Sequence, residues 1–186
     1  PGQPFRNGPA IDAWVVPGAA GDERHERLDA SEGHARVAVR VHAMGAGLWR
    51  YDYAVMNLDY ARALTEGSEP NLRVLDARGF SGLRVPLGAG GSVGATTFTD
   101  TDMLAANDWT VQVPAPGGSP AAVTWDAPAG SNTLDWGTLF HFSLVVDAPP
   151  VAGSVILLPA RAGMPADYSV ASLVPGAPPL FADGFE

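Results

Sequence analysis

The chain has 186 residues, of which 46% are hydrophobic and 17% charged, with 22 Gly, 17 Pro and no Cys. This Gly and Pro content excludes a bundle of long helices, the lack of Cys excludes disulfides and thiolate metal sites, and no apolar run reaches the roughly 18 residues of a membrane-spanning helix. The net charge of −9 argues against nucleic acid as a partner, because neutralising phosphates requires a positive stripe.

The first 36 residues have the composition of an arm, with Pro and Gly at short intervals and a polar stretch toward its end. One apolar island, residues 11–16, predicts a strand at a sheet edge, while residues 22–31 predict at most a brief helix. An apolar strand on a tether can join the edge of its own sheet or of a neighbour's sheet. We therefore take Ile11, Trp14 and Val16 as candidate interaction residues.

From Val37 onward apolar and polar residues alternate, which is typical of half-buried strands. Residues 37–42 and 49–56 predict two strands, and the Gly45-Ala46-Gly47 stretch between them predicts a hairpin turn. A polar loop is expected over residues 59–70, with at most one helical turn over residues 60–64. Further strands are expected, in chain order, at 73–75, 80–86, 93–98, 109–113, 122–125, 139–146, 154–158 and 168–174.

About ten short strands separated by turns predict an all-β fold, specifically an antiparallel β-sandwich of immunoglobulin-like type. A closed barrel is the alternative, because periodicity alone does not separate the two. The expected organisation is an N-terminal arm over 1–36, a sandwich domain over 37–175 and a Pro-rich tail over 176–186. The tail aromatics Phe181 and Phe185 are further candidate interaction residues.

One stretch of the chain resembles a known signature. Residues 45–57, Gly-Ala-Gly-Leu-Trp-Arg-Tyr-Asp-Tyr-Ala-Val-Met-Asn, are similar to the G-x-W-R-Y-x-Y-A signature of uncharacterised secreted proteins of xanthomonads and planctomycetes. The C-terminal Phe-Ala-Asp-Gly-Phe-Glu is similar to the ends of secreted proteins in the Lysobacter and Xanthomonas group. The resemblance implies export through a cleaved signal peptide, and an all-β module behind a larger N-terminal region. This chain departs from the pattern between Tyr60 and Gly82, where it carries an extra segment.

Three acidic residues, Asp100, Asp102 and Asp108, form the candidate metal site. Alternating carboxylates in a loop can direct their oxygens to one side, and Ca²⁺ takes about six to eight oxygen ligands. The sequence lacks the glycine-bearing loop of an EF-hand, and the same residues suit Asx turns or the cap of a short turn. Calcium is therefore the one cofactor suggested, and the turn interpretation is favoured over it.

The five Trp residues provide a second kind of candidate, because sugars stack on exposed aromatic faces. Trp49, Tyr51 and Tyr53 share one face of a predicted strand and are expected in the core. Trp136 and Trp109 are the candidate ligand-binding residues.

Signs of catalysis are weak in this sequence. His25 and His34 lie in the predicted arm, while His42 and His141 lie on predicted strands, and their spacing gives no signature of a catalytic zinc site. The sequence contains no G-x-S-x-G nucleophile elbow, although a triad can be assembled from distant residues.

The sequence favours a secreted, non-catalytic interaction or structural module of an extracellular or cell-surface protein. Its partners would be other protein subunits or copies of itself, joined through sheet edges, the arm or the tail. A carbohydrate-binding module, with calcium as a support, is the alternative, and a hydrolase domain without a recognisable motif is the third hypothesis. Nucleic acid and membrane insertion are not expected.

Overall fold

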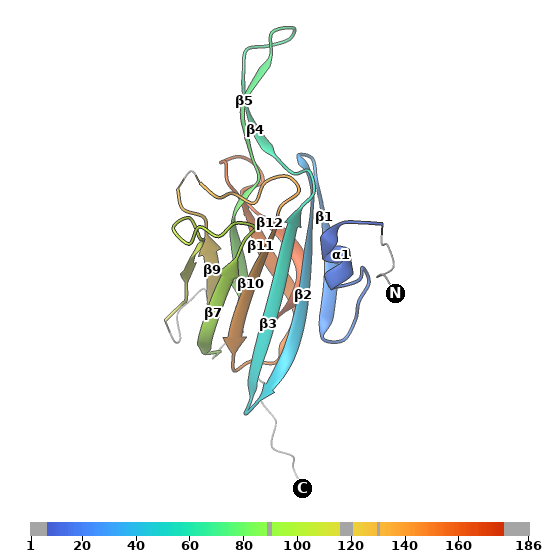
Figure 1. The fold of residues 1–186 in the computed structure, drawn as a ribbon, viewed down its shortest axis with the longest axis vertical. Coiled ribbons are helices and arrows are strands. Elements are labelled where there is room, and N and C mark those ends of the chain that lie inside the picture. The colour runs from blue at the N-terminus through green and yellow to red at the C-terminus, as the bar shows by residue number, and fades with distance from the viewer. Residues whose placement is uncertain (1–6, 89–90, 116–120, 130, 177–186) are drawn as a thin grey trace.

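The computed structural model describes residues 7–88, 91–115, 121–129 and 131–176. Within these ranges, ten strands form two five-stranded antiparallel sheets that pack together, and two more strands form a separate hairpin (Figure 1). The predicted all-β antiparallel sandwich of about ten short strands is thereby confirmed. No helix in the described ranges has both the length and the apolar character that a membrane crossing requires.

The first sheet, sheet A, has the strand order β1-β2-β3-β10-β7. Its strands are β1 (Glu23–Ala30), β2 (Gly33–Gly45), β3 (Leu48–Asn57), β10 (Leu139–Val146) and β7 (Val93–Thr99). All neighbouring pairs are antiparallel. Strands β3 and β10 therefore lie side by side although a long part of the chain separates them.

The second sheet, sheet C, has the strand order β12-β11-β6-β9-β8. Its strands are β12 (Tyr168–Pro175), β11 (Pro150–Pro159), β6 (Phe80–Pro86), β9 (Ala122–Asp126) and β8 (Thr110–Gln112). Strand β6 has the bounds that the alternation predicts, as does β10 of sheet A. The other strands of sheet C overlap their predicted ranges. Alternation succeeds here because each strand buries one face and exposes the other.

The β2–β3 hairpin shows how the sequence forms these strands. Its turn residues Gly45, Ala46 and Gly47 have φ angles of 84°, 52° and 76°, a left-handed conformation that two glycines adopt without strain. The inward side chains of β3 include Tyr51 and Tyr53, which are fully buried. The predicted turn and the predicted core face of β3 are both confirmed.

The core lies between sheets A and C and is rich in aromatic residues. Tyr51 donates a hydrogen bond from its hydroxyl to the carbonyl of Ala148 (2.9 Å), and Tyr53 donates to the carbonyl of Leu173 (2.9 Å), so neither buried phenol lacks a partner. The largest fully buried side chains are Trp125, Tyr51, Tyr53, Tyr60, Phe80, Phe140, Phe142, Ile11, Leu83, Leu134, Leu144 and Leu157.

The predicted strand over residues 11–16 is wrong, because the structure has a short helix there, α1 (Ala10–Trp14). Ile11 and Val15 are four residues apart, so one helical turn places both side chains on the same side. Both are fully buried in a small cluster with Ala38 and Ala54, on the face of sheet A that points away from the core. The apolar island therefore covers the outer face of its own sheet.

The predicted helix over residues 22–31 is also wrong. Residues 23–30 form β1, which pairs along its whole length with β2. Sheet pairing therefore starts inside the segment 1–36 that composition sets apart as an arm. β1 is an edge strand of sheet A, but it lies outside the residues 11–16 where an edge strand was expected, and Leu28 belongs to the main core.

The two-stranded sheet B consists of β4 (Arg62–Glu66) and β5 (Arg73–Arg78). This hairpin projects from one end of the sandwich (Figure 1) and falls inside the extra segment noted in the sequence. The helical turn expected over residues 60–64 does not form. The buried Arg62 holds the base of the hairpin through hydrogen bonds to Glu32 (2.9 Å) and to the carbonyls of Arg161 (3.1 Å) and Pro165 (3.0 Å).

Candidate functional site

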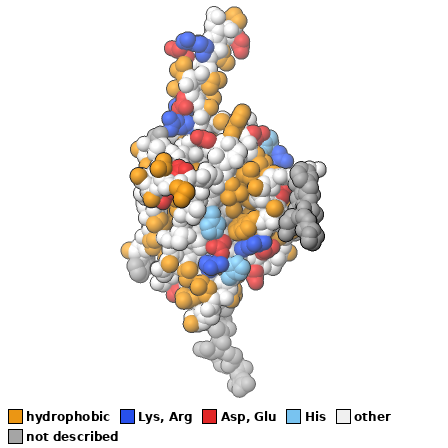
Figure 2. Space-filling view, viewed as in Figure 1, with side chains coloured by type: hydrophobic (Ala, Val, Ile, Leu, Met, Phe, Trp, Pro, Cys, Tyr) orange, Lys and Arg blue, Asp and Glu red, His pale blue; other side chains and the backbone are white. Residues whose placement is uncertain are grey.

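The outer face of sheet A carries a hollow of about 540 Å³, which we call the sheet A basin. Figure 2 shows it as a place where arginine, histidine and acidic side chains gather on the sandwich. Its wall and floor come from α1 and from strands β2, β3, β10 and β7. The lining residues are Trp14, Arg40, His42, Arg50, Asp52, Ala95, Thr96, Thr97, His141, Ser143 and Val145.

The alternation of the strands explains why polar side chains meet on this face. On β3, Tyr51 and Tyr53 point into the core, so Asp52 between them points outward. In the sheet register, Asp52 lies opposite Arg40 of β2 on one side and opposite Ser143 of β10 on the other. Three strands thus place their outward polar residues next to one another.

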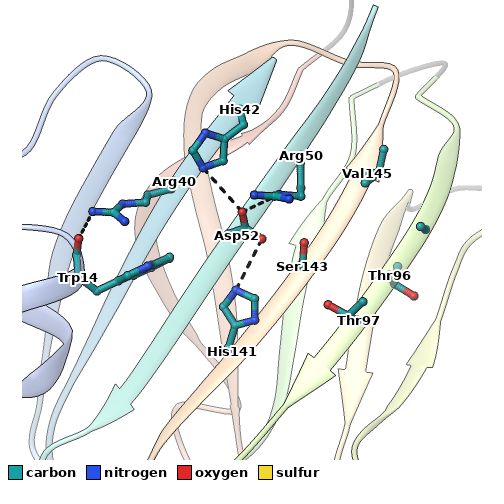
Figure 3. Close-up of a pocket in the computed structure, with 11 residues that line it drawn as sticks. Trp14, Arg40, His42, Arg50, Asp52, Thr96, Thr97, His141, Ser143 and Val145 are labelled. Atoms are coloured by element: carbon teal, nitrogen blue, oxygen red, sulfur yellow. Dashed lines mark hydrogen bonds and ion pairs between the residues drawn. The ribbon is translucent and has the colours of Figure 1, made fainter. Parts of the chain in front are cut away.

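Asp52 is the centre of the basin (Figure 3). Its carboxylate accepts a hydrogen bond from Nε of Arg50 at 2.8 Å. Nε2 of His42 lies 3.8 Å from Oδ2, and Nε2 of His141 lies 3.6 Å from Oδ1. Asp52 is nearly buried while both histidines remain partly accessible. The carboxylate therefore orients three nitrogen-bearing side chains around itself.

Trp14 forms the wall of the basin on the α1 side. Its ring meets the His141 ring edge to face, with the ring centroids 6.2 Å apart. The guanidinium carbon of Arg40 lies 5.2 Å from the centre of the Trp14 ring, a cation–π contact. Arg40 also donates a hydrogen bond to the carbonyl of Trp14 and another to Glu23 (2.7 Å). The indole is thus held in place at the edge of the basin.

Two further polar contacts fasten α1 to sheet A. Asp12 forms an ion pair with Arg36 of β2. His25 of β1 is buried, and its Nδ1 lies 2.6 Å from the carbonyl of Val15. The expectation that His25 belongs to a loose arm is therefore wrong, because it is part of the docking surface for α1. Removing α1 would remove the wall of the basin.

The basin offers more hydrogen-bond donors than acceptors. Arg40 and Arg50 bring two positive charges, whereas Asp52 is the one carboxylate in the lining. Glu23, which is not part of the lining, pairs with Arg40, with 2.7 Å between the Glu23 carboxylate and Nε of Arg40. Hydroxyl groups of threonine and serine add donors that also accept. This mixture of charged planar groups, hydroxyls and one indole is suited to binding a polar, hydroxyl-rich molecule.

The basin histidines and Asp52 do not form a metal centre. The two histidines approach different oxygens of Asp52, and Arg50 already occupies one of these oxygens. Over the described ranges, no group of three or more His, Asp or Glu residues has an arrangement that holds a metal ion.

The candidate calcium residues lie in the loop between β7 and β8, and none of them lines the basin. Asp100 accepts from the backbone N–H of Asp102 (2.9 Å), and Asp102 accepts from the N–H of Leu104 (2.6 Å), which are Asx turns. The Asn107 amide and the Leu104 N–H lower the pKa of Asp102. The turn role of Asp100 and Asp102 is thus visible, and calcium binding with Asp108 stays a prediction.

The two candidate ligand-binding Trp residues have opposite environments. Trp136 is 66% exposed and forms a small apolar hollow with Ala61 and Ala77. Trp109 is only 4% exposed, stacks on Phe98 and donates from its indole N–H to the carbonyl of Asn132 (2.7 Å). A surface role for Trp109 is therefore wrong, because its ring packs in the core.

The candidate interaction residues also have different environments in the structure. Ile11, on α1, is buried against sheet A and is not available to a partner, whereas Val16 is 52% exposed. Trp14 lies in the wall of the basin. Phe181 and Phe185 lie outside the described residues.

The basin has no motif in the sequence that marks it as a site. Arg40, His42, Asp52, His141 and Ser143 are visible as outward positions on predicted strands, but only the strand order places β10 against β3. Comparison with known proteins adds no relative, because no protein-family model and no curated protein matches the chain.

Proposed function

We propose that this chain is a non-catalytic binding module of a secreted protein and that its sheet A basin binds a saccharide. The observation that carries the proposal is the convergence of an indole wall, two guanidinium groups, two imidazoles and a fixed carboxylate on one open hollow. Sugar rings offer apolar C–H faces to an aromatic ring and hydroxyl groups to charged planar side chains. Secretion is supported by the sequence resemblance alone.

The geometry favours binding over assembly through the N-terminal segment. Ile11 and Val15 are fully buried against the outer face of their own sheet. An exchange of this segment between copies would first have to expose both side chains. Self-assembly through other sheet edges stays a prediction.

The test is a glycan array followed by titration calorimetry with the full chain. Trp14→Ala should weaken binding of the selected sugar by at least about fivefold, since stacking on an aromatic ring contributes on the order of 1 kcal/mol beyond the buried area. Trp136→Ala is the matched control, because it removes an exposed indole outside the basin. Adding Ca²⁺ or a chelator in parallel tests the calcium hypothesis.

Three results decide the proposal. Loss of binding in Trp14→Ala alone supports the basin. Loss in Trp136→Ala alone would move the site to the other exposed indole and contradict the proposal. An array on which no sugar binds would refute saccharide binding altogether.

A hydrolase is the second candidate function, because His141, Asp52 and Ser143 line the same hollow. Among the described residues, no hydrogen bond joins Ser143 to either basin histidine (Figure 3), and the basin is an open hollow. Measuring release of product from the sugars that bind, for the native chain and for Ser143→Ala, separates the candidates. Turnover that disappears in the variant would contradict a non-catalytic role.

A further inference from the structure

Arg50 has unused hydrogen-bonding groups that face the basin. Its side chain is 47% exposed, and its recorded partner within the described residues is Asp52, reached through Nε. The two terminal nitrogens therefore carry N–H groups without a protein acceptor in that part of the chain. A guanidinium presents such groups as a planar fork that fits two oxygens at once.

The one carboxylate of the basin, by contrast, is already in use. Both oxygens of Asp52 face nitrogen atoms, from Arg50 and His42 on one side and from His141 on the other. Neutral hydroxyl groups need acceptors as well as donors to satisfy their hydrogen bonds. The groups left free in this basin are mainly donors, so its best match is a ligand group that only accepts.

Building on the proposed saccharide function, we infer that the sugar bound in the sheet A basin carries a carboxylate, as in a uronic acid. The carboxylate would receive the terminal N–H groups of Arg50 side by side. The sugar ring would then lie toward Trp14, the indole on the opposite wall (Figure 3). A carboxylate carries only one negative charge, which limits its repulsion from a chain whose own net charge is −9.

The contacts of the two arginines distinguish Arg50 as the one that faces the ligand. Arg40 is neutralised by Glu23 and is held by the carbonyl of Trp14. Arg50 shares the carboxylate of Asp52 with two imidazoles. An anionic group placed against Arg50 meets a guanidinium that uses Nε for Asp52 and keeps its two terminal nitrogens for the ligand.

The test compares three probes by titration calorimetry with the full chain: oligogalacturonate, the same oligomer after its carboxylates are reduced to alcohols, and a sulfated galactan oligomer. Oligogalacturonate should bind at least ten times more tightly than the reduced oligomer, and its affinity should fall as salt is raised. Arg50→Gln should lose most of this preference. Arg73→Gln is the matched control, since Arg73 is an exposed arginine on the hairpin that pairs with Glu66.

Each other outcome overturns a different statement. Equal binding of the acidic and the reduced oligomer would overturn the carboxylate inference and leave saccharide binding intact. Tighter binding of the sulfated oligomer would also overturn it, by showing that a different anion is selected. If none of the three probes binds and the array shows no other sugar, the inference and the proposed function fall together. Arg50 lies on the surface, so thermal unfolding of Arg50→Gln should match that of Arg73→Gln.

Discussion

Asn57, at the end of β3, is a buried polar residue whose removal should be costly. Its Nδ2 donates to the carbonyls of Tyr60 (2.9 Å) and Leu134 (2.8 Å), and its Oδ1 accepts from the N–H of Tyr60 (2.8 Å). Asn57→Ala removes three hydrogen bonds, each worth about 1 kcal/mol. It also leaves the N–H and the carbonyl of Tyr60 without their side-chain partner, whereas Leu134 keeps the N–H of Phe80 (3.2 Å). The expected total is a loss of about 4 kcal/mol in the free energy of unfolding.

Urea unfolding followed by Trp fluorescence measures this loss. For a chain of this size, about 4 kcal/mol corresponds to a decrease in Tm of roughly 10 °C. Asn71→Ala is the matched control, because Asn71 is exposed on the hairpin loop, and it should change stability by less than about 0.5 kcal/mol. A loss below about 1 kcal/mol for Asn57→Ala, or one equal to the control, would refute the reasoning.

Two further predictions concern stability. Partial burial raises the pKa of Glu32, but hydrogen bonds from Tyr168 and Arg62 outweigh this effect. They hold the pKa of Glu32 below its ordinary value of 4.5. The ionised form therefore stabilises the fold above that value, and the contribution is lost as the pH falls through the lowered pKa. Urea midpoints between about pH 6 and about pH 3 should fall more steeply for the native chain than for Glu32→Gln; parallel curves would contradict this. Gly79→Ala would place a Cβ 2.0 Å from the carbonyl oxygen of Leu134, so we expect a loss of about 3 kcal/mol. The loss in the double variant Asn57→Ala/Gly79→Ala should be smaller than the sum of the two single losses, which a double-mutant cycle measures.

The strands of the sandwich were predictable because their inner face is packed and their outer face is not. A period of two is the direct result, and it predicts the β2–β3 hairpin and the core position of Tyr51 and Tyr53. The pattern fails for β1, whose buried residues His25 and Leu28 point to opposite faces and so break any simple alternation. Pairing with β2 makes it a strand, and that pairing is a tertiary effect.

The helix α1 had a local signal that composition concealed. Ile11 and Val15 are spaced by four residues, with Trp14 between them, which is a helical period in a very short segment. Flanking Pro residues made a strand the simpler interpretation. A segment of this length has little helical stability by itself, so its structure depends on the outer face of sheet A that it covers.

The basin was only half predictable. The register of the β2–β3 hairpin alone places Arg40 of β2 opposite Asp52 of β3. His141 and Ser143 join them only because β10 inserts between β3 and β7. Strand order in a sandwich depends on connections across the two sheets, and short-range periodicity carries no information about it.

Sheet A separates two tasks along a single stretch of polypeptide. On β3, Tyr51 and Tyr53 belong to the packed interior, while Arg50 and Asp52 line the basin and would touch the proposed ligand. Changes at the outward positions can therefore alter which molecule is bound while the folding of the domain is largely preserved. A designer who wants to change the binding preference can vary every second residue of a short strand, and natural mutation can act on the same positions.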